Sequence, residues 1–190
     1  MRSRHVRYFV GTLLACGALF GLGVLWWHGR LEHSQDKRIR SAAARYHLEP
    51  ALVKAIVWRE SRFHADVRGR AHEIGLMQLQ EAAAREWADA EHIQGFEHEH
   101  CFDPETNIMA GTWYLKKLLG RYTRTDDPLP YALADYNAGR GNVLKWNSGA
   151  ASTNSAAFIE QIGFPGTKEY VRSIMGRYAM YRPIFREEGN

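Results

Sequence analysis

The strongest constraint on this chain is an apolar helical segment that ends in a carboxylate. Residues 50–61 read PALVKAIVWRES, and positions 52, 56 and 60 recur every four residues on one helix face. Glu60 therefore continues a stripe that should face the core. Burial and the negative end of the helix dipole both favour a neutral carboxyl, so we expect a raised pKa for Glu60. The segment predicts a helical fold that carries a candidate general acid, although a Glu exposed at a fraying helix end would show the same pattern.

The distribution of charge argues against a nucleic-acid partner. The net charge is +4, but four basic residues precede Leu31 without any acidic residue among them, namely Arg2, Arg4, Arg7 and Arg30. The rest of the chain is therefore neutral. It has no basic stripe that could neutralise a phosphate backbone, so we expect no nucleic-acid binding.

The cysteine and histidine patterns predict neither a disulfide nor a metal site. Cys16 lies in an apolar N-terminal run, and Cys101 is alone in the body of the chain. We expect Cys101 to be a small buried or half-buried residue rather than a reactive thiol. The run His98-Glu99-His100-Cys101 is contiguous and lacks the ligand spacing of a closed zinc site. No metal and no cofactor are expected.

The N-terminal region predicts a membrane anchor. Residues 9–27 carry no charge and end in Trp26-Trp27, and a run of about nineteen residues suits a membrane-spanning helix. The preceding Arg residues predict a cytoplasmic N-terminus, so the body would lie outside the cytoplasm. A cleavable signal peptide is one alternative, but the run is long and lacks a clean cleavage site. A second alternative is a lipoprotein, because Leu13-Leu14-Ala15-Cys16 resembles a lipobox with Cys16 as the lipidated residue.

The rest of the chain predicts an all-α domain. Ser34 can cap a helix that runs to about His47, and Asp103-Pro104 is a strong start for a helix of about five turns. No stretch alternates with period two for long enough to form a sheet, although a short hairpin at 69–75 is possible. The expected helices are 34–47, 50–61, 79–90, 103–122, 129–136, 142–146, 156–162 and 167–181, with a flexible loop at 148–155. The expected divisions are a cytoplasmic stub and anchor (1–30), a linker (31–38), one domain (39–184) and a polar tail (185–190).

Six short motifs occur in an order that identifies a family resemblance. They are Glu60-Ser61, Gly75-Leu76-Met77-Gln78, Asp103-Pro104-Glu105-Thr106-Asn107-Ile108, Tyr136-Asn137-Ala138-Gly139, Phe158-Ile159-Glu160 and Tyr170-Val171. From about Ile39 to Tyr181 the chain resembles lytic transglycosylases of the soluble-lytic-transglycosylase type. The resemblance implies a lysozyme-like α-helical fold and peptidoglycan glycan strands as substrate. Together with the predicted N-terminal anchor, the resemblance indicates a bacterial inner-membrane protein whose catalytic domain lies in the periplasm.

The resemblance implies a reaction with one catalytic carboxyl. Family members cleave the β-1,4 bond between N-acetylmuramic acid and N-acetylglucosamine and leave a 1,6-anhydro end. Glu60 would protonate the leaving oxygen and then, as a carboxylate, accept a proton from the hydroxyl of the muramic acid. Ordinary glycosidases instead need a second carboxylate. The resemblance implies no cofactor and leaves the protein partners, the preference for strand ends or interiors, and the need for peptide stems open.

The resemblance also implies roles for other residues. Tyr136 would hydrogen-bond Glu60, although a core tyrosine is the plainer interpretation. Gln78 and the backbone around Met77 would donate to sugar groups. Glu160 would line the cleft unless it is a solvated surface residue, and Tyr170 would lie in the cleft or in the packing. Ser61 and Asn137 complete the expected substrate-binding set.

The chain departs from the family pattern in the loop before Gly75. The family usually has Ser at the position of Gly69, a small residue at that of Glu73, and Pro and Thr within 80–83. Goose-type lysozymes, which are distant relatives, carry an acid in this loop. If Glu73 points into the cleft it can orient a water, and the chain would be a hydrolytic muramidase. A non-catalytic glycan-binding scaffold module is the alternative from a different functional class.

Overall fold

The computed structural model describes residues 29–187 continuously and, before them, residues 17, 19, 21, 23, 26 and 27. The chain divides into two compact units, Met1–Gln35 and Asp36–Asn190. Most of the expected membrane helix at 9–27, and Cys16 with it, lies outside the described residues. Within the described part, no helix has the length and apolar character needed to span a bilayer. In the first unit the Ser34 hydroxyl donates to the carbonyl of Leu31 at 2.7 Å instead of capping the next helix.

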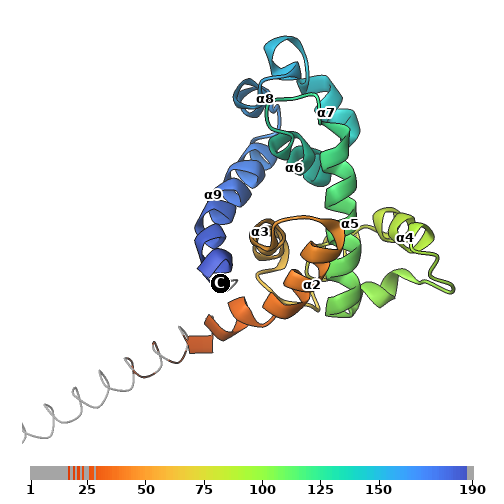
Figure 1. The fold of residues 1–190 in the computed structure, drawn as a ribbon, viewed down its shortest axis with the longest axis vertical. Helices are drawn as coiled ribbons and strands as arrows, with labels where there is room; N and C mark the ends of the chain where they lie inside the picture. Colours follow the sequence, from red (N-terminus) through yellow and green to blue (C-terminus); the bar gives the residue numbers. More distant parts are fainter. Residues whose placement is uncertain are drawn as a thin grey trace, which may run out of the picture. The chain divides into compact units, whose positions relative to one another are not determined.

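The second unit is a bundle of short helices, shown in Figure 1. The described part of the chain contains no named strand, so the prediction of an all-helical fold is confirmed there. In chain order the elements are α2 (Asp36–Tyr46), α3 (Pro50–Ser61), α4 (Glu81–Ala90), η1 (His98–Phe102), α5 (Pro104–Arg121), α6 (Leu129–Ala138), α7 (Arg140–Trp146), η2 (Gly149–Ser152), α8 (Ser155–Gln161) and α9 (Pro165–Glu187).

Local sequence signals explain where the main helices begin and end. Pro50 opens α3, where its missing N–H costs nothing. The helix ends at Arg62, which adopts a left-handed conformation (φ 52°) and donates its N–H to the carbonyl of Trp58. At the start of α5, a side-chain oxygen of Asp103 accepts the backbone N–H of Thr106 at 2.9 Å. The predicted helix starts at Pro50 and at Asp103-Pro104 are both confirmed.

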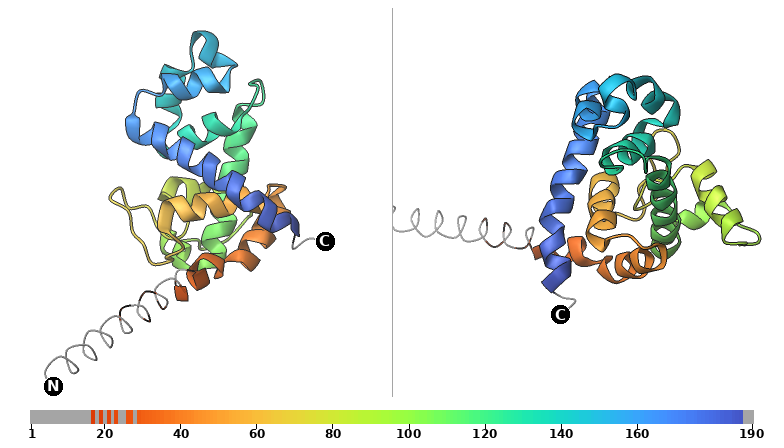
Figure 2. Two further views of the ribbon diagram at one scale, coloured as in Figure 1. Left: turned by 90° about the vertical axis from the view of Figure 1, so that its left-hand side faces the viewer. Right: turned by 45° about the horizontal axis from the view of Figure 1, so that its top comes forward.

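Helix α3 forms the centre of the core. Its apolar residues are buried on several sides, with Val53, Ile56 and Val57 fully inaccessible to solvent. Helix α9 packs along α3, and α2 packs against both α3 and α5, as the two views in Figure 2 show. Helix α6 packs against both α5 and α9. The end of α3 therefore lies where several helices meet, and the side chain of Glu60 emerges there.

Three predictions on local structure need correction. Residues 148–155 are not a flexible loop, because they contain the 3-10 helix η2 and the Asn154 cap of α8. Helix α9 runs from Pro165 to Glu187, so the tail expected at 185–190 begins inside a helix in which Phe185 is buried. The possible hairpin at 69–75 is reduced to isolated antiparallel bridges, Arg68 with Ile74 and Ile74 with Leu79.

Candidate functional site

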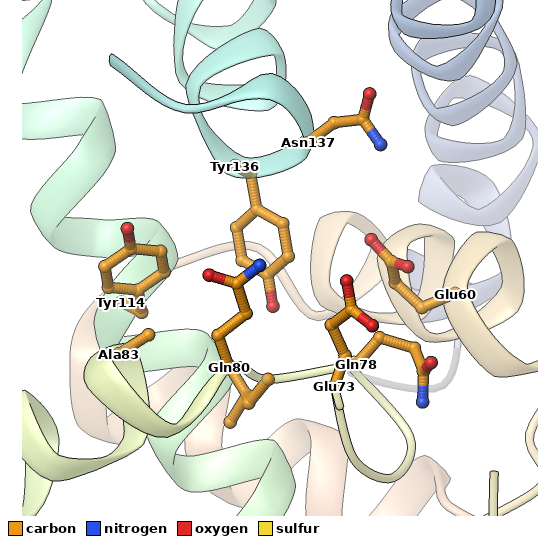
Figure 3. Close-up of a pocket in the computed structure, with 9 residues that line it drawn as sticks. Glu60, Glu73, Gln78, Gln80, Ala83, Tyr114, Tyr136 and Asn137 are labelled. Atoms are coloured by element: carbon orange, nitrogen blue, oxygen red, sulfur yellow. The ribbon is translucent and has the colours of Figure 1, made fainter. Parts of the chain in front are cut away.

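Glu60 lies in the last turn of α3, and its side chain lines a cleft that is formed by five parts of the domain. Figure 3 shows this cleft with the side chains that line it. The lining comes from α3, the loop that precedes α4, α4 itself, α5 and α6. The lining residues are Glu60, Glu73, Gln78, Leu79, Gln80, Ala83, Tyr114, Tyr136 and Asn137.

The surroundings of Glu60 favour a carboxyl that carries a proton near neutral pH. Burial raises its pKa from 4.5 to about 7, and the charge of Glu73 adds to the increase. The hydrogen bond from Tyr170 and the positive charge of Arg59 act in the opposite direction but do not cancel the effect of burial. The raised pKa agrees with the expectation from the apolar stripe of α3. Such a carboxyl can donate a proton and later accept one.

Tyr170 is the residue that holds Glu60 in place. It lies on α9 with only 2% of its surface exposed, and its hydroxyl donates to Oε1 of Glu60 at 2.5 Å. Burial and the nearby Glu60 raise the pKa of Tyr170 well above its ordinary value, so the hydroxyl keeps its proton. The assignment of this hydrogen bond to Tyr136 is therefore wrong. Tyr136 on α6 instead donates to the carbonyl of Met77 at 2.8 Å, whereas α9, which carries Tyr170, packs along α3.

Asn107 fixes the loop beneath the cleft. Its side chain is fully buried and forms three hydrogen bonds of 2.8 Å. Its Oδ1 accepts the N–H of Met77, and its Nδ2 donates to the carbonyls of Ile74 and Cys101. Gly75 has φ 76°, and an added Cβ there would lie 2.4 Å from Nδ2 of Asn107. A single buried amide thus sets the path of the backbone, and Gly75 is the residue that this path requires.

The Met77 backbone does not serve as a donor to sugars, contrary to the expectation. Its N–H is bound by Asn107, its carbonyl accepts from Tyr136, and its side chain is fully buried. Gly111 on α5 makes room for that side chain, because a Cβ there would lie 2.4 Å from Sδ of Met77. Met77 is therefore a packing residue beneath the cleft.

Gln78 and Asn137 line the cleft as expected, but their donors and acceptors differ from the simple prediction. Nε2 of Gln78 donates to the carbonyls of Val67 (3.1 Å) and Gly75 (2.9 Å), so Gln78 braces the loop and offers Oε1 as an acceptor. Oδ1 of Asn137 accepts from Thr167 at 2.8 Å, which leaves its amide nitrogen as the donor toward the cleft. The two amides therefore present opposite hydrogen-bonding groups to a ligand.

Four expected site residues are not among those that line the cleft, namely Met77 and Tyr170, described above, and Ser61 and Glu160. Ser61 is rotated by about 100° around α3 from Glu60, so it points away from the cleft. It is buried, and its hydroxyl donates to the carbonyl of Val57 at 3.1 Å. Glu160 is exposed on α8 and forms an ion pair with Arg172 at 2.5 Å. Ser61 is thus a helix-packing residue, and Glu160 is the solvated surface residue of the plainer interpretation.

The cleft contains residues that sequence reasoning did not assign. Tyr114 on α5 packs edge-to-face against Tyr136, with ring centroids 5.7 Å apart. Gln80 and Ala83 at the start of α4 form the neighbouring wall. For Gln80 and Ala83, the sequence signal was the departure of residues 80–83 from the family pattern. For Tyr114, the signal was its position beside the apolar stripe of α5, where a side chain can face a cleft instead of the core.

Glu73 brings a second carboxylate to the cleft. It lies on the turn before Gly75, and its Oε2 accepts the backbone N–H of Ala71 at 3.0 Å. Figure 3 shows its carboxylate, like that of Glu60, among the side chains that line the cleft. The described residues contain no group of His, Cys, Asp or Glu that could hold a metal ion. The cleft therefore combines one proton-bearing carboxyl, a second carboxylate, two tyrosines and amide groups.

Comparison with known proteins identifies relatives of the whole domain. The family model described as "Transglycosylase SLT domain" matches residues 37–159. The chain is 31% identical over 166 residues to the soluble lytic murein transglycosylase of Escherichia coli (strain K12), covering 84% of this chain and 25% of the relative. It is 36% identical over 121 residues to membrane-bound lytic murein transglycosylase C of Yersinia pestis (strain Pestoides F), covering 60% and 33%. The chain thus spans about a quarter of the length of the first of these relatives.

Two solved structures share the fold. One is an inactive mutant of the lytic transglycosylase Slt from Pseudomonas aeruginosa, with TM-score 0.74, 25% identity and coverage of 83% of this chain and 25% of that chain. The other is the 70-kDa soluble lytic transglycosylase in complex with bulgecin A, with TM-score 0.74, 28% identity and coverage of 86% and 26%. The lysozyme-like helical fold expected from the sequence is confirmed by this similarity.

Proposed function

This chain belongs to the transglycosylase SLT domain family, and we propose that it is a peptidoglycan lytic transglycosylase. It cleaves the β-1,4 bond between N-acetylmuramic acid and N-acetylglucosamine and leaves a 1,6-anhydro end. The observation that carries the proposal is the state of Glu60, a buried carboxyl with a pKa of about 7 that faces an open cleft. The names of the relatives, which are murein transglycosylases, support the choice of substrate.

Glu60 performs both proton transfers of the reaction. In the first step its proton moves to the glycosidic oxygen, the bond from that oxygen to the muramic acid C1 breaks, and the N-acetylglucosamine end departs. The acetamido group of the substrate stabilises the positive charge on the sugar. In the second step the C6 hydroxyl attacks C1 and its proton moves to the Glu60 carboxylate. The proton is thereby returned to Glu60 and no water is consumed.

Tyr170 and the cleft walls support this cycle. Tyr170 donates to Glu60 in both steps and stabilises the carboxylate that exists between them. Tyr114 and Tyr136 present ring surfaces from α5 and α6 to the glycan. Asn137 offers an amide donor and Gln78 an acceptor for the hydroxyl and acetamido groups of the sugars. These residues bind and orient the strand, whereas Glu60 carries the chemistry.

The proposed location is the bacterial inner membrane, with the domain from Ile39 to Ile184 held in the periplasm by residues 9–27. The uncharged N-terminal run supports an anchor, and one relative is a membrane-bound transglycosylase. Lipidation at Cys16 is the competing route. Alkaline extraction of membranes and metabolic palmitate labelling of the full chain separate the two, because lipidation requires Cys16 and a spanning helix does not.

The test of the reaction is mass spectrometry of the products that the detergent-solubilised full chain releases from purified sacculi. We expect anhydro-muropeptides from the wild type. We expect Glu60→Gln to bind sacculi normally and to release at least about a hundredfold less, because general acid–base catalysis contributes about 10² to 10⁴ in rate. Glu99→Gln is the matched control, since Glu99 is exposed and outside the cleft. Wild-type protein that binds without releasing anything would instead identify a scaffold module.

A further inference from the structure

The turn that carries Glu73 has room for its carboxylate because residue 69 is a glycine. The N–H of Gly69 donates to the carbonyl of Glu73 at 2.7 Å and closes the turn. A Cβ added to Gly69 would lie 2.2 Å from Oε2 of Glu73 and 2.8 Å from Oε1 of Gln78. The φ of Gly69 is not in the left-handed region, so the position needs glycine for space rather than for backbone conformation. The carboxylate of Glu73 thus fills the volume that a side chain at position 69 would occupy.

This arrangement directs the Glu73 carboxylate into the cleft. The N–H of Ala71 holds Oε2, while the carboxylate lines the same cleft as Glu60. Among the ion pairs of the described residues, none involves Glu73. Its charge raises the pKa of Glu60, so the two carboxyl groups are within electrostatic reach of each other. The cleft therefore offers an acid and a separate, unneutralised base.

A carboxylate in this place can activate a water molecule. Glycosidases that use water directly place a general acid on one side of the scissile bond and a general base on the other, with room for the water between them. We propose that Glu73 is a second catalytic carboxylate that directs water to the sugar C1, so that the chain releases reducing ends in addition to anhydro ends. The inference rests on the proposed function, because both routes begin with the same cleavage by Glu60.

The hydrolytic branch conserves atoms and protons. Glu60 protonates the leaving oxygen and the bond to C1 breaks, as in the transglycosylase reaction. The oxygen of a water molecule then bonds to C1, and one proton of that water moves to Glu73. The products are a reducing muramic acid end, a protonated Glu73 and an ionised Glu60, and both carboxyls return to their starting states by proton exchange with solvent. Water and the C6 hydroxyl thus compete for the same carbon.

The experiment measures the share of reducing ends among the released products. Sacculi are first reduced with borohydride to remove existing ends, and the full chain then releases muropeptides, which are labelled with borodeuteride. Mass spectrometry separates labelled reducing ends from unlabelled anhydro ends. We expect both kinds from the wild type. Glu73→Gln should lower the labelled share at least about tenfold, as loss of a general base requires.

A second variant tests the same step without removing the carboxylate. Gly69→Ala places a methyl group where Oε2 of Glu73 lies, and the flexible end of the Glu73 side chain moves aside. The labelled share should fall as in Glu73→Gln, while circular dichroism verifies that the fold is intact. Glu105→Gln, which removes an exposed charge on α5 outside the cleft and away from this turn, should leave the share unchanged.

The outcomes separate this inference from the proposed function. Wild-type products that are entirely anhydro, or a labelled share that is the same in wild type and Glu73→Gln, overturn the role of Glu73 and leave the transglycosylase intact. Products that are entirely reducing overturn the transglycosylase function while supporting Glu73. A labelled share that survives in both Glu73→Gln and Gly69→Ala shows that water reaches C1 without this carboxylate, and it refutes the inference.

Discussion

Replacement of Tyr170 by Phe should change the pH at which Glu60 loses its proton. The Tyr170 hydroxyl donates to Glu60 at 2.5 Å and lowers a pKa that burial has raised to about 7. A hydrogen bond to a charged group is worth about 1.5 to 3 kcal/mol, and about 1.4 kcal/mol corresponds to one pKa unit. Because protonated Glu60 keeps part of this bond, we expect Tyr170→Phe to raise the pKa of Glu60 by roughly one unit.

The assay is the initial rate of release from dye-labelled sacculi under kcat/KM conditions across a range of pH. In the wild type the rate should decline as pH rises through about 7, since Glu60 must be protonated to start the reaction. In Tyr170→Phe this decline should begin about one unit higher. The plateau at lower pH should also fall, because the carboxylate formed in the first step loses its partner.

Tyr136→Phe is the matched control for this shift. It also removes one hydroxyl from the cleft region, but that hydroxyl binds the carbonyl of Met77 and not Glu60. The pH of the decline should therefore stay at its wild-type value. If Tyr136→Phe shifts the decline and Tyr170→Phe does not, the assignment of the hydrogen bond to Tyr170 is wrong. A wild-type decline far from pH 7 would contradict the pKa of Glu60 itself.

Two further predictions concern stability. The folded-state pKa of Glu60 lies above its unfolded value of 4.5, so the stability from its neutral form is fully present below pH 4.5 and is lost as pH rises through about 7. Glu60→Gln has no group to ionise and avoids this loss. In thermal unfolding, the free energy of unfolding of the variant relative to wild type should therefore increase by up to about 3 kcal/mol from pH 4 to pH 9. A difference that does not depend on pH would contradict the linkage. Asn107→Ala breaks three buried hydrogen bonds and should cost about 3 to 5 kcal/mol in urea unfolding; a cost below about 1 kcal/mol would show that Asn107 does not organise the loop.

The parts of the fold that follow from local chemistry could be predicted from the sequence. Pro50 and the Asp103-Pro104 pair determine helix starts through interactions with their immediate neighbours, and both starts are correct. The position of Glu60 on the apolar face of α3 follows from helical periodicity alone. Its raised pKa follows from that burial, so the sequence is sufficient to predict the acid–base chemistry of this one residue.

The partners of these residues depend on packing between distant segments and could not be predicted. The family resemblance assigns Tyr136 as the partner of Glu60, but the packing of α9 along α3 brings Tyr170 to it instead. The same limit applies to Lys54, a basic residue within the apolar run of α3. Its ammonium group is buried against Asp36 at 2.6 Å, because α2 packs over α3. Helical periodicity places a side chain on a face but does not say which helix covers that face.

The two carboxyl groups of the cleft lie on parts of the fold that differ in how well they tolerate substitution. Glu60 and Tyr170 lie on α3 and α9, and this helix packing produces both the raised pKa and the bond that controls it. Glu73 lies on a turn whose position depends on Asn107, while its own carboxylate depends on the Ala71 N–H and on the space above Gly69. Substitutions at positions 69 and 73 can therefore change the second carboxylate without disturbing the core. In the proposed mechanism, these two positions can therefore change the competition between water and the C6 hydroxyl, while the cleavage step by Glu60 stays the same.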